Sequence, residues 1–170
     1  MPPALALIGV GSNVGASTHV PAALATLLGR HGVLHVSSVV ETAPVGMTDG
    51  SGRFWNLALA LPVDPGSDMK GMQAALHALE RDAGRDRDAP GQSWKARPLD
   101  LDLLFVVEDG AVPSDALPRE PWIRPLVLEL LQHLNIDCPD ATDPPALAIS
   151  LEVAGRALGP GAATHTLDPA

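Results

Sequence analysis

The sequence predicts an α+β protein: a ferredoxin-like split βαβ sandwich with an antiparallel-rich sheet and C-terminal additions. Strand-like apolar runs and helical segments alternate in the order β-α-β-β-α-β. The two middle strands, 33–42 and 54–63, are joined by a Gly/Pro-rich loop and not by a helix. A doubly wound parallel sheet is the alternative, and it is disfavoured because it needs a crossover helix at this point.

Each predicted element has a local signal in the sequence. The first strand, 4–11, is an apolar run that ends in glycines, and the strand at 33–42 is rich in valine. Pro21 lies early in a helix over 21–32, and either Ser67 or Asp68 caps a second helix that ends near Gly84. The remaining elements are an alternating strand at 54–63, a strand within 94–107, a helix from about Pro125 to His133, and loops at 43–53, 86–93 and 108–122.

The C-terminal part, from Pro139 to Ala170, is rich in Ala, Pro and Gly. One short helix is expected near "SLEVAGRALG", with a loosely ordered tail over 159–170. The chain shows no internal repeat and no interdomain linker. Its 170 residues are therefore expected to form a single domain over 1–170.

Composition and charge disfavour several classes of protein. The 46% hydrophobic and 18% charged residues are typical of a globular chain. A net charge of −9 disfavours nucleic acid as a partner, although a few arginines suffice to bind a small polyanion. The sequence contains neither an apolar run of about 18 residues nor a basic segment typical of a signal peptide. With Cys138 as its one cysteine, we expect a cytoplasmic monomer that has no membrane partner.

The glycine-rich stretch "GVGSNVG" at 9–15 matches no nucleotide-binding motif completely. In G-x-G-x-x-G the third glycine would stand at position 14, where the chain has Val14, and the ending of a P-loop is absent. A glycine-rich turn between a strand and a helix explains the stretch equally well. The six histidines show no spacing typical of a zinc site.

Two carboxylates interrupt the apolar strand in "WKARPLDLDLLFVV". Asp100 and Asp102 are two residues apart, so in a strand they point to the same face. Two neighbouring carboxylates repel each other and require a positive partner. Paired carboxylate oxygens suit Mg²⁺, which also takes water and substrate phosphates as ligands.

Basic residues cluster just before this pair and supply a second requirement of phosphate chemistry. They are Arg85, Arg87, Lys95 and Arg97. Arginine forks match phosphate oxygens, and carboxylates with arginines but no protein nucleophile are typical of phosphoryl transfer. The alternative is structural pairing of the two aspartates with Arg97 and Arg124.

Four blocks of the sequence, between about Leu5 and Leu131, form a recognisable series: "ALIGVGSNVG", "VSSVVETAPVG" leading to "FWNLALAL", "HALERDAGR" and "WKARPLDLDLLF". With these blocks in this order, the sequence resembles the 6-hydroxymethyl-7,8-dihydropterin pyrophosphokinases of folate biosynthesis. This resemblance implies an α+β fold and the Mg²⁺-dependent transfer of pyrophosphate from ATP to a pterin alcohol, which produces AMP.

The resemblance also implies roles for individual residues. Asp100 and Asp102 would bind two Mg²⁺ ions and form the catalytic set with Arg85 and Arg97. The ATP-binding residues would be His77, Glu80, Arg87, Trp94, Arg97, Leu103, Arg119 and Arg124. The pterin-binding residues would be Thr42, Pro44, Val45, Phe54, Asn56, Asp100 and Leu126.

Several positions depart from the family pattern and favour a divergent member. Lys95–Ala96 replaces a Gly-Pro-like pair, Ser93 replaces a basic residue, and Arg119 replaces an ATP-binding histidine. Leu126 stands where a second aromatic residue would stack on the pterin. The alternative function is therefore a pterin-binding paralogue with an altered substrate or lost turnover.

Overall fold

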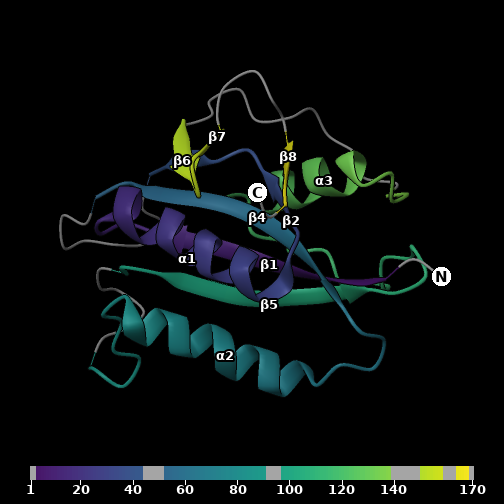
Figure 1. Ribbon diagram of the computed structural model, residues 1–170, viewed down its shortest axis with the longest axis horizontal. Coiled ribbons are helices and arrows are strands. Elements are labelled where there is room, and N and C mark those ends of the chain that lie inside the picture. The colour runs from purple at the N-terminus through teal and green to yellow at the C-terminus, as the bar shows by residue number, and fades with distance from the viewer. Residues whose placement is uncertain (1–2, 44–51, 91–96, 139–149, 159–163, 169–170) are drawn as a thin grey trace.

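One antiparallel sheet forms the centre of the protein (Figure 1). The computed structural model describes residues 3–43, 52–90, 97–138, 150–158 and 164–168. The sheet has the order β5-β1-β4-β2-β8, and β3 pairs with β4. The order β5-β1-β4-β2, with a helix after β1 and another after β4, is that of a split βαβ sandwich, so the predicted fold class is confirmed. The strands are β1 Ala4–Ser12, β2 Leu34–Ser37, β3 Val40–Thr42, β4 Phe54–Val63, β5 Asp100–Val107 and β8 Thr164–Leu167.

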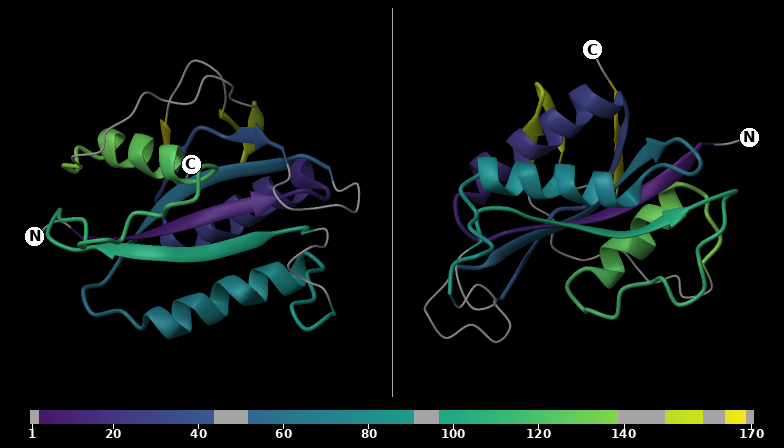
Figure 2. Two further views of the ribbon diagram at one scale, coloured as in Figure 1. Left: turned by 180° about the vertical axis from the view of Figure 1, so that it is seen from behind. Right: turned by 90° about the horizontal axis from the view of Figure 1, so that it is seen from below.

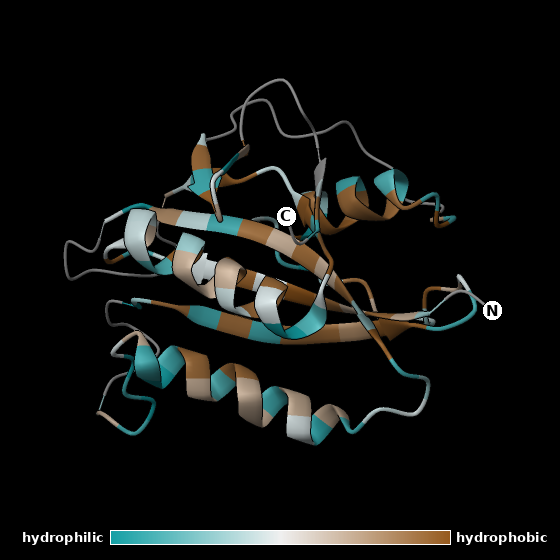
Figure 3. Cartoon of the chain, viewed as in Figure 1, coloured by the Kyte–Doolittle hydropathy of each residue, from teal (hydrophilic) through white to brown (hydrophobic). Residues whose placement is uncertain are grey.

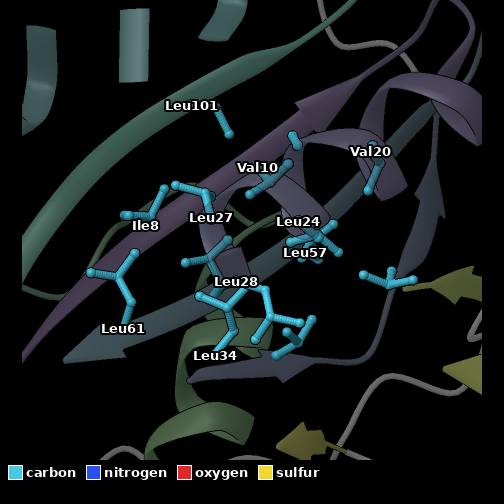
Figure 4. Close-up of a cluster of buried hydrophobic side chains, with 14 of the residues drawn as sticks. Ile8, Val10, Val20, Leu24, Leu27, Leu28, Leu34, Leu57, Leu61 and Leu101 are labelled. Atoms are coloured by element: carbon cyan, nitrogen blue, oxygen red, sulfur yellow. The ribbon is translucent and has the colours of Figure 1, made fainter. Parts of the chain in front are cut away.

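Helices cover both faces of the sheet (Figure 2). α1 (Ala16–His31) and α2 (Met69–Asp82) lie on one side, and α3 (Arg124–His133) lies on the other. On the α1 side, Leu24 and Leu27 of the helix pack against strand residues such as Leu57 (Figure 4). Apolar residues predominate on β1 and α3, whereas polar and apolar residues alternate along α2 (Figure 3). In the described residues, each helix is too short or too polar to cross a membrane.

A β-bulge in β5 sets the direction in which its side chains point. Leu7 of β1 lies opposite Phe105, but the next residue, Ile8, lies opposite Leu103, so Leu104 is an extra residue in β5. Leu101 on one side of the bulge faces α1 and α2, while Phe105 on the other side faces α3. Because of the bulge, even-numbered residues such as Asp100 and Asp102 face the α3 side in the first half of β5, and odd-numbered residues such as Phe105 face it in the second half.

The observed helices agree with the predicted ones except at one end. α1 begins at Ala16 and not at residue 21, because Gly15 adopts a left-handed φ of 60° and its carbonyl accepts the first helical bonds. Pro21 consequently lies inside the helix. Asp68 is the cap of α2, since its side chain accepts a hydrogen bond from the Lys70 N–H at 3.0 Å.

The helix predicted near "SLEVAGRALG" is wrong. The segment forms a hairpin of β6 (Leu151–Val153) and β7 (Arg156–Leu158). Its two turn residues, Ala154 and Gly155, have φ of 49° and 76°, as a two-residue hairpin turn requires. The signal that distinguishes a strand here is the period of two, since Leu151 and Val153 are buried and the residue between them is exposed.

The C-terminal segment 159–170, expected to be a loosely ordered tail, contains a strand. Residues 164–167 form β8, which pairs with β2 along Leu34–Ser37. Leu167 is 1% exposed and belongs to the core beneath α1. The same core includes residues of the β6–β7 hairpin, so the C-terminal additions complete it.

We expect Leu167→Ala to lower the free energy of unfolding by about 2–5 kcal/mol, because it removes a buried side chain and leaves a cavity. Asp168→Ala is the matched control, since Asp168 forms an exposed ion pair with Arg156 and should change stability by about 1 kcal/mol or less. Urea denaturation measures both. Equal small effects would show that β8 contributes nothing to the core.

Candidate active site

A cavity of about 420 Å³ lies where β1, β4 and β5 meet on the α3 side of the sheet. Strands and the segment before α3 supply its walls, so residues far apart in the sequence come together. The cavity is lined by Gly9, Val10, Gly11, Asn56, Arg97, Asp100, Asp102, Leu103, Leu104, Glu120, Trp122 and Ile123. Both strand aspartates therefore line the same cavity, as their spacing predicts.

Two glycines of β1 keep the floor of this cavity open. Gly9 pairs with Asp102 and Gly11 pairs with Asp100 across the sheet. A Cβ atom on Gly9 would lie 3.5 Å from the Ile123 side chain, and one on Gly11 would lie 3.6 Å from Asn56 Oδ1. Side chains at these positions would fill the cavity beside the aspartates. The glycines of "GVGSNVG" that reach the site thus belong to a strand and not to a phosphate-binding loop.

Asp100 is held by arginines on both of its oxygens. Its Oδ2 accepts a hydrogen bond from Arg97 Nη1 at 2.8 Å, and its Oδ1 pairs with Arg85 Nη1. Arg97 is fixed in turn by Asn13, whose Oδ1 accepts from the Arg97 N–H at 2.5 Å. Arg87 adds a more distant charge, with Nη2 3.6 Å from Asp100 Oδ1. These arginines are the positive partner that Asp100 requires beside a second carboxylate.

Glu80 of α2 connects these arginines to the strand. Its side chain is completely buried, and its Oε2 accepts from Arg87 Nε at 2.6 Å. Its Oε1 accepts from Arg87 Nη2 at 2.7 Å, from Arg85 Nη1 at 3.2 Å and from the Leu101 N–H at 2.7 Å. These hydrogen bonds give both oxygens of the buried carboxylate partners. The result is one network that runs from α2 through two arginines to Asp100.

Asp102 has a different environment from its neighbour. The residue is exposed, yet partial burial of its carboxylate raises its pKa, and the negative charge of Asp100 raises the pKa further. The positive charge of Arg87 opposes this shift. Among the described residues, no group of three or more His, Cys, Asp or Glu side chains could hold a metal ion. A cation at the two aspartates would therefore need phosphate or water oxygens as further ligands, which fits Mg²⁺.

Three predicted pterin residues, Thr42, Phe54 and Asn56, lie on β3 and β4. Asn56 lines the cavity, and its Nδ2 donates to Thr42 Oγ1 at 2.6 Å. Thr42 pairs across the strands with Phe54, so these two side chains share one face. Phe54 is half-buried at the start of β4. The structure thus brings Asn56 and Thr42 into contact beside the aspartates.

Other predicted residues lie away from the aspartates. His77 lies on α2, where its Nε2 is 2.9 Å from Gln73 Nε2. Arg119 and Arg124 line a second cavity of about 350 Å³ with Asp137 and Cys138. Leu126 is 1% exposed and packs in the core between α3 and the sheet. Pro44, Val45 and Trp94 lie outside the described residues.

Sequence reasoning missed part of the cavity wall. Gly9 and Gly11 lie at the end of the predicted strand 4–11, where their spacing of two makes them neighbours on one face, but they are not among the predicted site residues. Trp122 is 37% exposed and lines the cavity next to Ile123, in a segment predicted only as loop. No local pattern in the segment indicates that it folds over the aspartates.

The two aspartates should respond oppositely to neutralisation. Asp102→Asn should raise the free energy of unfolding at pH 7, because a raised pKa means that the ionised carboxylate is disfavoured in the folded protein. The gain should disappear below the ordinary carboxyl pKa of 3.8, where Asp102 is protonated in both states. Asp100→Asn should lower the free energy of unfolding by about 1.5–3 kcal/mol, because it weakens charged hydrogen bonds.

Urea denaturation of both variants across this pH range, without metal, measures the difference. Destabilisation by both substitutions at pH 7 would contradict the unequal environments of the two carboxylates.

Comparisons with known proteins show the family of this chain. Residues 7–135 match the profile of the family described as 7,8-dihydro-6-hydroxymethylpterin-pyrophosphokinase (HPPK). The chain is 34% identical over 135 residues to the folate synthesis bifunctional protein of Arabidopsis thaliana. The match covers 75% of this chain but only 26% of that relative. The protein belongs to the HPPK family.

Proposed function

We propose that this protein transfers pyrophosphate from ATP to the hydroxymethyl group of 6-hydroxymethyl-7,8-dihydropterin, with Mg²⁺ as cofactor. Membership of the HPPK family supports the reaction. The observation that carries the proposal is the single cavity in which Asp100, Asp102 and Asn56 meet beside three arginines. In this proposal the enzyme acts as a cytoplasmic monomer on two small molecules.

The reaction determines what the cavity must provide. The pterin hydroxyl oxygen forms a bond to the β-phosphorus of ATP and loses its proton. The bond from that phosphorus to the α–β bridging oxygen breaks, so AMP leaves with this oxygen. Mg²⁺ held by Asp100 and Asp102 would neutralise phosphate charge during the transfer. The chain's own task is to align the hydroxyl with the phosphorus and to stabilise charge.

The arginines are suited to stabilise the transferred group. Arg97 lines the cavity, and Arg85 and Arg87 reach Asp100 from the loop after α2. In the structure described here their guanidinium groups bind carboxylates. ATP phosphates match such forks as carboxylates do, and they carry several negative charges, so we propose that nucleotide binding draws these arginines from Asp100 onto phosphate oxygens. Asp100 is then released to bind Mg²⁺.

Asn56 and Trp122 are the groups we propose for the pterin ring. Because Asn56 Nδ2 donates to Thr42, its Oδ1 can accept a hydrogen bond from a donor on the ring edge. Trp122 offers a flat apolar surface in the cavity wall, whereas Leu126 is buried in the core. We therefore propose Trp122 as a stacking surface for the pterin.

An assay for AMP release tests the proposed activity. We expect AMP only when ATP, Mg²⁺ and the pterin alcohol are all present, and we expect Asp102→Ala to reduce the rate to background. Glu108→Ala is the matched control, because Glu108 is an exposed acidic residue just after the same strand. Pterin binding without AMP release would support the binding paralogue and overturn the proposed catalysis.

The Trp122 proposal predicts a selective effect on one substrate. Trp122→Leu should weaken pterin binding about 2- to 12-fold, which corresponds to the aromatic contribution of about 0.5–1.5 kcal/mol, and should leave the Kd of ATP unchanged. Trp122→Phe keeps an aromatic face and should recover most of the affinity. Calorimetric titration with the pterin alcohol measures both. Equal affinities for all three proteins would place the ring elsewhere.

A further inference from the structure

Glu129 of α3 is a buried acidic residue that the proposed reaction does not use. The residue is 3% exposed, and its Oε1 accepts a hydrogen bond from the Ser38 N–H at 2.7 Å. Its Oε2 has no hydrogen-bond partner within the described residues. Burial raises the pKa of Glu129, and hydrogen bonds from Ser38 oppose the shift. Burying an acidic group is unfavourable, so a structural reason is needed for a glutamate at this position. Its hydrogen bond with the Ser38 N–H indicates that reason.

Ser38 lies in a β-bulge between β2 and β3. Val36 is opposite Leu59 and Val40 is opposite Asn56, so three residues on one strand face two on the other. Such an extra residue leaves backbone groups without ladder partners. Side chains replace them here: Ser37 Oγ accepts from the Ala58 N–H at 2.8 Å and donates to the Ser38 carbonyl at 2.9 Å. Glu129 accepts the remaining Ser38 N–H.

The bulge decides which residues of β3 face the α3 side of the sheet. Before it, odd-numbered His35 faces the α3 side, opposite Ala60. After it, even-numbered residues face that side, as Val40 and Thr42 do. A one-residue change of register exchanges the two faces of a strand. Without the bulge, Thr42 would point away from Asn56 and the hydrogen bond of 2.6 Å between them would be lost.

We infer that Glu129 is a positioning residue for the pterin side of the cavity: it holds the Ser37–Val39 bulge, which aims Thr42 at Asn56. This inference rests on the proposed function, because it assigns Asn56 to the pterin. Among the described residues, Glu129 is not part of the cavity wall, so it acts on the cavity through β3. Its helix, α3, packs against β2 and β4, the strands joined to β3 by the bulge and by pairing (Figure 1). Its loss should disturb Asn56 and leave the aspartates in place.

Two substitutions at Glu129 test this role. Glu129→Leu removes the acceptor for Ser38 and should raise the Kd of the pterin alcohol about 3- to 10-fold, the effect of losing one hydrogen bond, while the Kd of ATP stays unchanged. Glu129→Gln keeps an oxygen acceptor at the same position, so the Kd should stay within about two-fold of the original. Calorimetry measures the Kd values, and amide hydrogen exchange at Ser38 reports directly on the bulge.

Leu131→Ala is the control for general destabilisation, because Leu131 is fully buried on the same helix and touches the core. It should lower Tm without changing the pterin Kd. If Glu129→Leu does not fold, Ser37→Ala removes the other side-chain partner of the bulge and should weaken pterin binding in the same way.

Unchanged pterin affinity in every folded variant, or equal loss in Leu131→Ala, would overturn the positioning role. Failure of the original protein to bind pterin would refute the proposed function instead. In that case amide hydrogen exchange at Ser38 still tests the structural part of the inference. Faster exchange in Glu129→Leu than in the original protein would show that Glu129 holds the bulge, and equal exchange would show that it does not.

Discussion

The site depends on the buried carboxylate of Glu80, which serves the fold and the chemistry together. β5 is an edge strand, and its outward N–H groups need partners. Glu80 accepts from the Leu101 N–H, and Gln73, about two turns earlier on the same face of α2, accepts from the Leu103 N–H at 3.2 Å, so α2 replaces a neighbouring strand. The same carboxylate binds Arg85 and Arg87. Docking α2 on β5 therefore places the arginines at the aspartates.

Two β-bulges, one in β5 and one between β2 and β3, determine which side chains face the α3 side of the sheet. Each shifts a strand by one residue and exchanges the faces of its side chains. The first allows Asp102 to face the cavity while Phe105 remains in the core on the same side. The second turns Thr42 toward Asn56. At both places an interruption of regular strand pairing changes the face to which the following side chains point.

Two identical side chains on one strand acquire different properties from their surroundings. Asp100 lies at the end of the strand, where Arg85 and Arg97 reach both of its oxygens. Asp102 lies farther along the strand and is exposed, with a pKa raised by partial burial and by the charge of Asp100. Asp100 is therefore part of a network of ion pairs in this structure, whereas Asp102 is accessible to solvent.

Much of the fold follows from local patterns that the sequence determines by itself. The period of two predicts that Asp100 and Asp102 share a face, and the alternating residues predict β4 over 54–63, because both depend on geometry within one strand. Register, bulges and helix docking depend on pairing between distant segments, such as Asn13 with Arg97. Only the tertiary structure could therefore show that Glu129 accepts a hydrogen bond from the Ser38 N–H. It alone places Trp122 at the cavity and Leu126 in the core, because side-chain exposure is decided by what packs against each residue.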